Sequence, residues 1–180
     1  MYIHLVEPAV LDNEDENDFR GGEMTKPINE RVEQQMANFA EEVPICACFN
    51  IRKAARAISQ LYDDVLRPSG LRVTQFSILA VTRRLGPVTV TRLAEVTVTD
   101  RTTLTRNLKL LAQQKLIRIT LGKDRREREV TLTDRGHLAL AQAFPLWKDV
   151  QKQVAQKLGR ERFQRLLSDL GATVGLARAG

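Results

Sequence analysis

Residues 89–113, TVTRLAEVTVTDRTTLTRNLKLLAQ, hold two short helical patterns that meet at a tight turn. The first pattern begins at Thr89, whose hydroxyl can cap a helix, and it runs through Val96. A Thr-Val-Thr segment then leads into a second helix, which runs from Asp100 to about Gln114. Two short helices joined in this way predict a helix-turn-helix.

The second helix of this pair has one apolar face and one cationic face. Leu104, Leu108 and Leu111 recur at helical spacing and are expected to be buried. The opposite face then carries Arg101, Thr102, Thr103, Thr105, Arg106 and Lys109. A row of charges is often only a solvated face. Because this row lies on the second helix of a helix-turn-helix, we expect it to contact DNA, with Arg106 pairing with a guanine edge.

A β-hairpin with a basic tip is predicted directly after this helix. Apolar residues alternate with polar ones over residues 117–121 and again over 130–132, which is the periodicity of strands. The segment between these strands carries the basic residues Lys123, Arg125, Arg126 and Arg128. Taken alone, such a segment could simply keep the edge of a hairpin soluble.

Longer helices are predicted on both sides of this segment. Before it lie a helix over residues 46–66 and a second helix capped by Thr74. After it lie a long helix that Thr133 caps and a last helix that begins at Arg160. The apolar seams of 46–66 and 134–176 exceed what the small lobe between them can cover, so we expect these helices to pack in a dimer.

The charge is distributed unevenly along the chain. Residues 1–45 carry 3 basic and 11 acidic side chains, whereas residues 46–180 carry 25 and 11. A basic body favours a polyanionic partner, although charge alone does not separate this from an ordinary surface. We expect residues 1–27 to be disordered, because they are acidic and lack apolar periodicity, and 28–45 to form an extra helix. The remainder forms one domain, with its DNA-binding lobe at about 71–133.

Several classes of protein are disfavoured by the sequence. No apolar run approaches the roughly 18 residues of a membrane span, and no signal peptide is evident, so we expect a cytoplasmic protein. The sequence contains no H-E-x-x-H, phosphate-binding loop or G-x-S-x-G pattern. We therefore expect neither an enzyme nor a cofactor. The two cysteines would need ligands from a second subunit to hold a metal ion, and we expect no metal site.

The order of these elements resembles the MarR family of winged helix-turn-helix transcription regulators. The resemblance covers residues 46 to about 172, and its strongest part is in and after the hairpin. There, Asp124-Arg125-Arg126 is followed by Leu132-Thr133-Asp134-Arg135-Gly136. Two further parts are similar: Leu71-x-x-Thr74-Gln75-Phe76-x-x-Leu79, and Leu93-Ala94 with Thr102-x-Leu104-Thr105-Arg106-x-Leu108-x-x-Leu111.

This resemblance implies a mainly α-helical fold with a small hairpin wing, and a homodimer held by its N- and C-terminal helices. Such a dimer would bind a pseudo-palindromic operator in double-stranded DNA, most simply as a repressor. Either Arg125 or Arg126 would enter the minor groove, while Asp124 would pair with an arginine. The family often binds a small aromatic ligand, for which Phe144 and Trp147 are candidates, although core packing explains these rings equally well.

The cysteines carry a second, narrower resemblance. Cys48-Phe49, followed by Ala54-Ala55-Arg56, resembles the start of the first helix in the hydroperoxide-sensing OhrR branch, where a lone cysteine is the sensor. Tyr62 falls where that branch keeps a tyrosine that bonds the thiol, but Arg52 replaces its second tyrosine. The chain has a second cysteine, Cys46, whereas the sensor of that branch is a lone cysteine. The simpler interpretation is that a free cysteine in a helix seam only fills space. Two other hypotheses stay open: a winged helix that binds only proteins, and a thiol-dependent peroxide-reducing enzyme.

Overall fold

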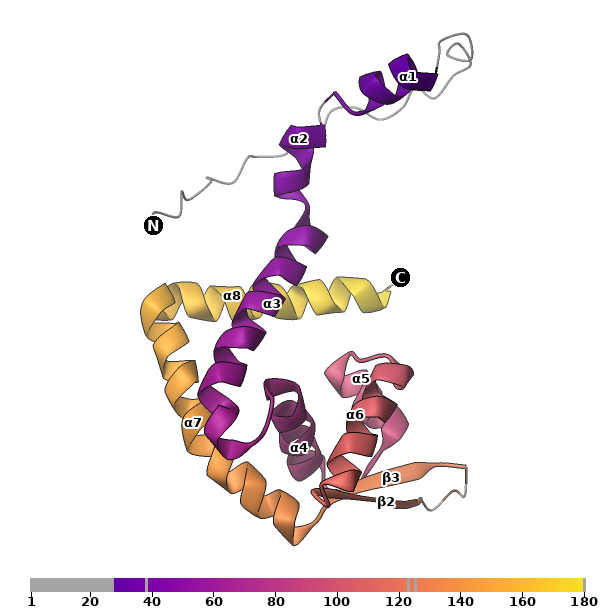
Figure 1. Cartoon of the computed structure of the whole chain (residues 1–180), viewed down its shortest axis with the longest axis vertical. Coiled ribbons are helices and arrows are strands. Elements are labelled where there is room, and N and C mark those ends of the chain that lie inside the picture. Colours follow the sequence, from indigo (N-terminus) through magenta and orange to yellow (C-terminus); the bar gives the residue numbers. More distant parts are fainter. Residues whose placement is uncertain (1–27, 38, 123, 125, 180) are drawn as a thin grey trace. The chain divides into compact units, whose positions relative to one another are not determined.

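The computed structural model describes residues 28–179 except 38, 123 and 125 (Figure 1). The disorder expected for residues 1–27 therefore concerns a segment outside the described residues. The chain forms two compact units, residues 1–57 and 58–180. This division falls within a helix, and the main domain that we expected to begin at residue 46 stays a prediction.

The described part of the first unit is helical but interrupted. It contains α1 (Ile28–Gln35), α2 (Phe39–Glu42), the 3-10 helix η1 (Val43–Ile45) and the first half of α3 (Ala47–Leu66). The prediction of one continuous helix over residues 28–45 is therefore wrong. Pro44 has no N–H to donate to a helical ladder, which accounts for the 3-10 turn after Glu42. The earlier break, after Gln35, falls in a stretch where every described side chain between residues 30 and 42 is exposed. Tertiary packing thus gives no support to a longer helix.

The second unit contains the predicted helix-turn-helix and hairpin. Its elements after α3 are η2 (Arg67–Ser69), α4 (Val73–Leu85), β1 (Val88–Thr89), α5 (Val90–Thr97), α6 (Arg101–Gln113), β2 (Ile117–Leu121), β3 (Arg128–Leu132), α7 (Asp134–Leu158) and α8 (Arg160–Ala179). The strands form an antiparallel sheet in the order β1-β3-β2. Val130 of β3 pairs with Val88 of β1 and with Ile119 of β2. The hairpin agrees with the prediction from the sequence, whereas β1 was not predicted.

The start of α4 differs from the prediction that Thr74 caps it. The helix begins at Val73, two residues earlier than a Thr74 cap implies, and the backbone N–H of Val73 donates to the Asp63 carboxylate at 2.7 Å. The side-chain oxygen of Gln75 accepts the backbone N–H of Arg72 at 3.0 Å. A carboxylate from α3 therefore takes the capping role that we assigned to a threonine hydroxyl.

The core of the second unit lies between α4, α5, α6 and the sheet. Its largest completely buried apolar side chains outside α7 are Leu66, Leu79, Leu93, Leu104, Leu111 and Val130. The rings of Phe76 and Phe144 stack on Trp147 at centroid distances of 5.8 and 5.7 Å. Leu93 from α5 and three leucines from α6 thus fix the helix-turn-helix pair onto the rest of the unit.

A hydrogen-bonded junction joins the hairpin to α7. The hydroxyl of Thr133 accepts the backbone N–H of Gly136 at 3.1 Å, which confirms the predicted cap, and it donates to the carbonyl oxygen of Lys115 at 2.6 Å. The backbone N–H of Thr133 donates to the carbonyl oxygen of Leu116 at 3.1 Å. A Cβ on Gly136 would lie only 1.9 Å from that oxygen. Glycine is therefore required at this close approach.

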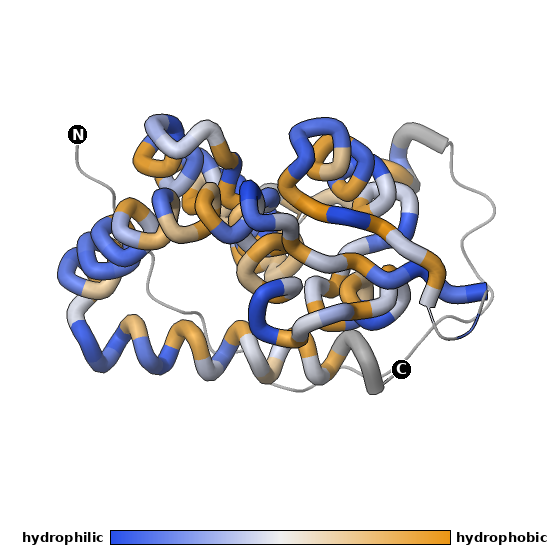
Figure 2. The backbone as a smooth tube through the Cα atoms, turned by 90° about the horizontal axis from the view of Figure 1, so that it is seen from below, coloured by the Kyte–Doolittle hydropathy of each residue, from blue (hydrophilic) through white to orange (hydrophobic). Residues whose placement is uncertain are grey.

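The last helix carries an apolar face that its own unit does not bury. In α8 no described side chain is buried, and Leu166, Leu167, Leu170 and Val174 are exposed. Polar and apolar residues alternate along this helix in Figure 2. Among the described residues, no helix is long and apolar enough to span a membrane.

Candidate nucleic-acid interface

The two helices of the helix-turn-helix are fixed by side-chain caps at their first turns. The hydroxyl of Thr89 accepts the backbone N–H of Arg92 at 3.1 Å, as predicted. Asp100 accepts the backbone N–H of Thr103 at 2.8 Å, so it is the cap of α6 rather than a residue of its first turn. This hydrogen bond holds the pKa of the Asp100 carboxyl below its usual range.

The turn between α5 and α6 passes through a conformation that its sequence does not favour. Val98 has φ 49° and ψ 44°, in the left-handed region that suits glycine. Its N–H donates to the carbonyl oxygen of Glu95 at 3.2 Å, and the N–H of Thr99 donates to that of Ala94 at 3.0 Å. These bonds close the end of α5 and set the direction in which α6 begins.

The two faces of α6 are arranged as the sequence predicted. Leu104, Leu108 and Leu111 are buried. The opposite side chains are all exposed: Arg101, Thr102, Thr103, Thr105, Arg106 and Lys109. Their exposure is confirmed, whereas their contact with DNA stays a prediction.

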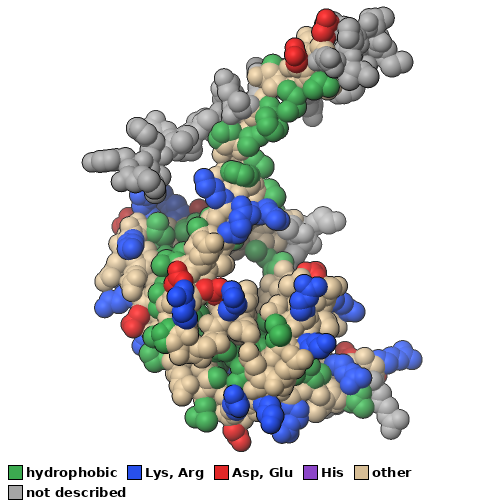
Figure 3. Space-filling model, in the orientation of Figure 1, with side chains coloured by type: hydrophobic (Ala, Val, Ile, Leu, Met, Phe, Trp, Pro, Cys, Tyr) green, Lys and Arg blue, Asp and Glu red, His purple; other side chains and the backbone are tan. Residues whose placement is uncertain are grey.

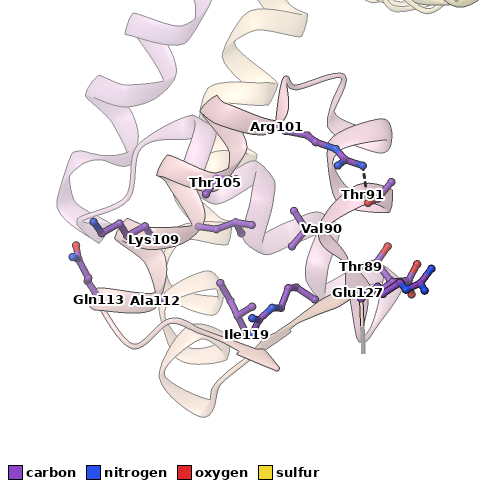
Figure 4. Close-up of a pocket in the computed structure, with 13 residues that line it drawn as sticks. Thr89, Val90, Thr91, Arg101, Thr105, Lys109, Ala112, Gln113, Ile119 and Glu127 are labelled. Carbon is purple, nitrogen blue, oxygen red and sulfur yellow. Dashed lines mark hydrogen bonds between the residues drawn. The ribbon is translucent and has the colours of Figure 1, made fainter. Parts of the chain in front are cut away.

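A groove of about 860 Å³ runs between α6, the start of α5 and the hairpin (Figure 4). Its apolar lining residues are Val90, Leu108, Ala112 and Ile119, and its basic ones are Arg101, Lys109, Arg126 and Arg128. Thr105 lines it as well, whereas Thr102 and Arg106 lie on another side of α6. The cationic row of α6 is thus divided into a stripe that faces the hairpin and a stripe that does not.

The hairpin brings two of the four predicted basic residues to this groove, Arg126 and Arg128. Lys123 and Arg125 lie outside the described residues. Asp124 accepts the backbone N–H of Arg126 at 2.9 Å, and its predicted pairing with an arginine side chain stays a prediction. Figure 3 shows Lys and Arg side chains around this end of the second unit.

One contact in the interface was not anticipated from the sequence. Nη2 of Arg101 donates to the hydroxyl oxygen of Thr91 at 3.2 Å, across the gap between α6 and α5 (Figure 4). Both residues occupy the first turns of their helices. The ten-residue separation carries no periodic signal, and only the packing of the two helices reveals the pair.

The candidate sensor residues belong to other parts of the chain than the elements that line the groove. Cys46 immediately precedes α3, Cys48 is in its first turn, and both are exposed and free of disulfides. The Tyr62 hydroxyl donates to the side-chain oxygen of Gln151, and burial raises the pKa of this tyrosine. Among the described residues, no three His, Cys, Asp or Glu side chains gather as a metal site requires.

The candidate ligand residues are engaged with each other. Trp147 stacks on Phe144, which is 49% exposed, and on the buried ring of Phe76. The ammonium of Lys148 lies 5.9 Å from the centroid of the Phe144 ring. The structure therefore brings Phe144 and Trp147 together, at the edge of the core.

Comparison with known proteins agrees with this geometry. A model of the MarR family matches residues 69–127. The chain is 32% identical over 83 residues to an uncharacterized HTH-type transcriptional regulator, YwoH, of Bacillus subtilis; the match spans 46% of this chain and 61% of that protein. The chain thus covers less than two thirds of this curated relative.

Solved structures give a longer match. The M. tuberculosis transcriptional regulator MosR in complex with DNA is similar with a TM-score of 0.66 and 42% identity, over 74% of this chain and 98% of that one. A mutant MarR from E. coli complexed with operator DNA has a TM-score of 0.67 and 23% identity, over 75% and 96%, which shows the fold alone. From the helix-turn-helix, the wing and these similarities together, we conclude that the chain belongs to the MarR family of winged-helix transcription regulators.

Proposed function

We propose that this protein is a sequence-specific transcription regulator that binds double-stranded DNA through α6 and the β2–β3 hairpin. The observation that carries the proposal is the groove between them, where basic side chains from both elements face the same space. An exposed recognition helix fits the major groove, and a basic wing beside it can reach the neighbouring backbone or minor groove. The MosR regulator, at 42% identity, was crystallised with DNA.

The residues proposed to contact DNA are Arg101, Thr102, Thr103, Thr105, Arg106, Lys109, Lys123, Arg125, Arg126 and Arg128. Within this set, the hydroxyl groups can bond either phosphates or base edges, and the arginines can pair bidentately with guanine. Arg106 remains our choice for the guanine contact, because it projects from the exposed face of α6. Since its partner is genomic DNA, we expect the protein to act in the cytoplasm.

We propose further that the regulator is a homodimer on a pseudo-palindromic operator. The exposed leucines of α8 leave a 20-residue helix with no described buried side chain, and such a helix gains little stability alone. A second copy would bury this face. The two recognition helices would then lie roughly 34 to 36 Å apart, in successive major grooves.

The release signal is proposed to be a small aromatic ligand near Phe144 and Trp147, or oxidation of Cys48. Both thiols are exposed, so an organic hydroperoxide can reach them. Cys48 would attack the peroxide oxygen, giving a sulfenic acid on the protein and releasing the alcohol. The Tyr62 hydroxyl already donates its hydrogen to Gln151, so it could only accept a hydrogen bond from a cysteine thiol.

Binding to duplex DNA at several salt concentrations tests the central proposal. Each phosphate neutralised should contribute about −0.9 to the slope of log affinity against log salt, so several contacts should give a steep dependence. Genomic footprinting would then locate the operators. A protein that leaves no footprint on any duplex would be a protein-interaction module instead.

The proposed role is also non-catalytic. Catalytic turnover of an organic hydroperoxide by the purified protein, if the Arg106→Ala variant turned it over as well, would contradict this non-catalytic role.

A separate experiment tests the thiol signal. Wild type and Cys48→Ser should be treated with an organic hydroperoxide while bound to the operator. Release of the wild type alone supports a sensor, whereas equal retention of both leaves ligand binding as the better account.

A further inference from the structure

Two arginines of the helix-turn-helix, Arg92 and Arg101, bond to different kinds of side chain. Arg92 lies 3.1 Å from the Glu95 carboxylate, so its charge is partly compensated within the protein. Arg101 instead donates to a neutral hydroxyl, that of Thr91, at 3.2 Å. A hydroxyl restrains the guanidinium without neutralising it, so Arg101 keeps its full charge for an anionic or electron-rich partner.

The backbone under both members of this pair is fixed. Thr91 is the second residue of α5, whose first turn is capped by Thr89, and Arg101 is the first residue of α6, whose first turn is capped by Asp100. Both side chains are exposed, and both line the groove between α6 and the hairpin. Figure 4 shows the guanidinium extended toward Thr91. One of its five N–H groups is used by this bond, which leaves enough donors for a bidentate contact.

We propose that Thr91 is a positioning residue that holds Arg101 in the orientation in which it reads a base of the operator. This inference rests on the proposed function, since it assigns a second base-reading arginine beside Arg106. The N-terminal residues of a recognition helix are the ones that reach base edges, and Arg101 is the first of them. Holding a long side chain in place before binding removes part of the entropy that binding must otherwise cost.

The test compares Thr91→Val, which keeps the shape but removes the hydroxyl, with Thr91→Ser, which keeps the hydroxyl. Each variant is measured on the footprinted operator and on a set of duplexes substituted at each position. Thr91→Val should weaken operator binding by roughly 2- to 12-fold and relax preference at the same position as Arg101→Ala. Thr91→Ser should retain most of the affinity and the preference.

A double-mutant cycle separates positioning from direct contact. In an Arg101→Ala background, Thr91→Val should have no further effect, because the guanidinium that it positions is gone. An equal loss in both backgrounds, uniform over all duplexes, would overturn the proposal and make Thr91 a phosphate contact. Thermal unfolding of each variant excludes loss of fold. Failure of the proposed function looks different: the wild type itself would show no preference among duplexes.

Discussion

Replacing Gly136 with alanine tests the junction between the hairpin and α7. The added Cβ would lie 1.9 Å from the carbonyl oxygen of Leu116, whereas ordinary contacts begin at about 3.4 Å, so the two segments must separate by about 1.5 Å. Neither group is the end of a flexible side chain, because the oxygen belongs to the backbone. Thr133 would then lose the hydrogen bonds that it makes to Leu116 and Lys115.

The magnitude follows from these contacts. Each lost hydrogen bond costs about 1 kcal/mol, and the overpacking costs about 1 to 3 kcal/mol. Alanine returns about 1 kcal/mol through its higher helix propensity. The free energy of unfolding should therefore fall by roughly 2 to 4 kcal/mol, and Tm by roughly 5 to 15 °C.

Denaturant unfolding at one fixed protein concentration measures this loss, since the stability of a dimer depends on concentration. The matched control is Gly175→Ala in α8, where an added Cβ meets nothing within 4 Å. Helical spacing places this residue on the side of α8 away from Leu166 and Leu170. This control should leave stability unchanged or raise it by up to about 1 kcal/mol. A Gly136→Ala variant as stable as the wild type would refute the reasoning about the junction.

Three further perturbations test the helix-turn-helix. The Thr103 N–H lowers the pKa of the Asp100 carboxyl in the folded protein, so the ionised carboxylate stabilises the fold. This contribution is fully present above the unfolded-state pKa and is lost as the pH falls through the folded-state pKa. Below about pH 4, the free energy of unfolding of Asp100→Asn should therefore fall less steeply with pH than that of the wild type, as measured by denaturant unfolding at several pH values. Val98→Gly should raise the free energy of unfolding by up to about 1 kcal/mol, because relief of left-handed strain exceeds the entropic cost of glycine; a loss of stability would show that Val98 is not strained. Arg106→Ala should cost roughly 1 to 3 kcal/mol of binding and relax preference at one operator position, whereas Arg126→Ala should weaken binding to all duplexes and reduce the salt slope by about 1; equal losses on every duplex would exclude Arg106 as a reading residue.

The features predicted correctly are those that local chemistry determines. The Thr89 and Thr133 caps follow from a hydroxyl placed just before an apolar helical pattern, and both hydroxyls accept the expected backbone N–H groups. The buried stripe of α6 follows from leucine spacing alone. The partner of each cap is three residues away, so the caps need no tertiary information.

The features that were missed depend on packing between distant segments. Asp63 caps α4 from ten residues away, and Thr91 meets Arg101 across two helices. The break in the helix predicted over 28–45 reflects a different limit. Its apolar spacing is helical, but spacing does not reveal whether another surface covers the face. Val98 is a third case: the backbone hydrogen bonds that close the end of α5 hold it in a left-handed conformation that valine disfavours, so residue type did not indicate it.

The junction around Thr133 also links the two elements proposed to bind DNA. Lys115 and Leu116 lie in the turn between the end of α6 and the start of β2, and the N–H of Leu116 donates to the carbonyl oxygen of Leu111 in α6 at 2.9 Å. Thr133, directly before α7, bonds both carbonyl groups of that turn. A displacement of α7 must therefore carry the end of α6 and the hairpin with it, or break these bonds at about 1 kcal/mol each. A ligand held at Trp147, which lies on α7, would act on both DNA-binding elements through this junction.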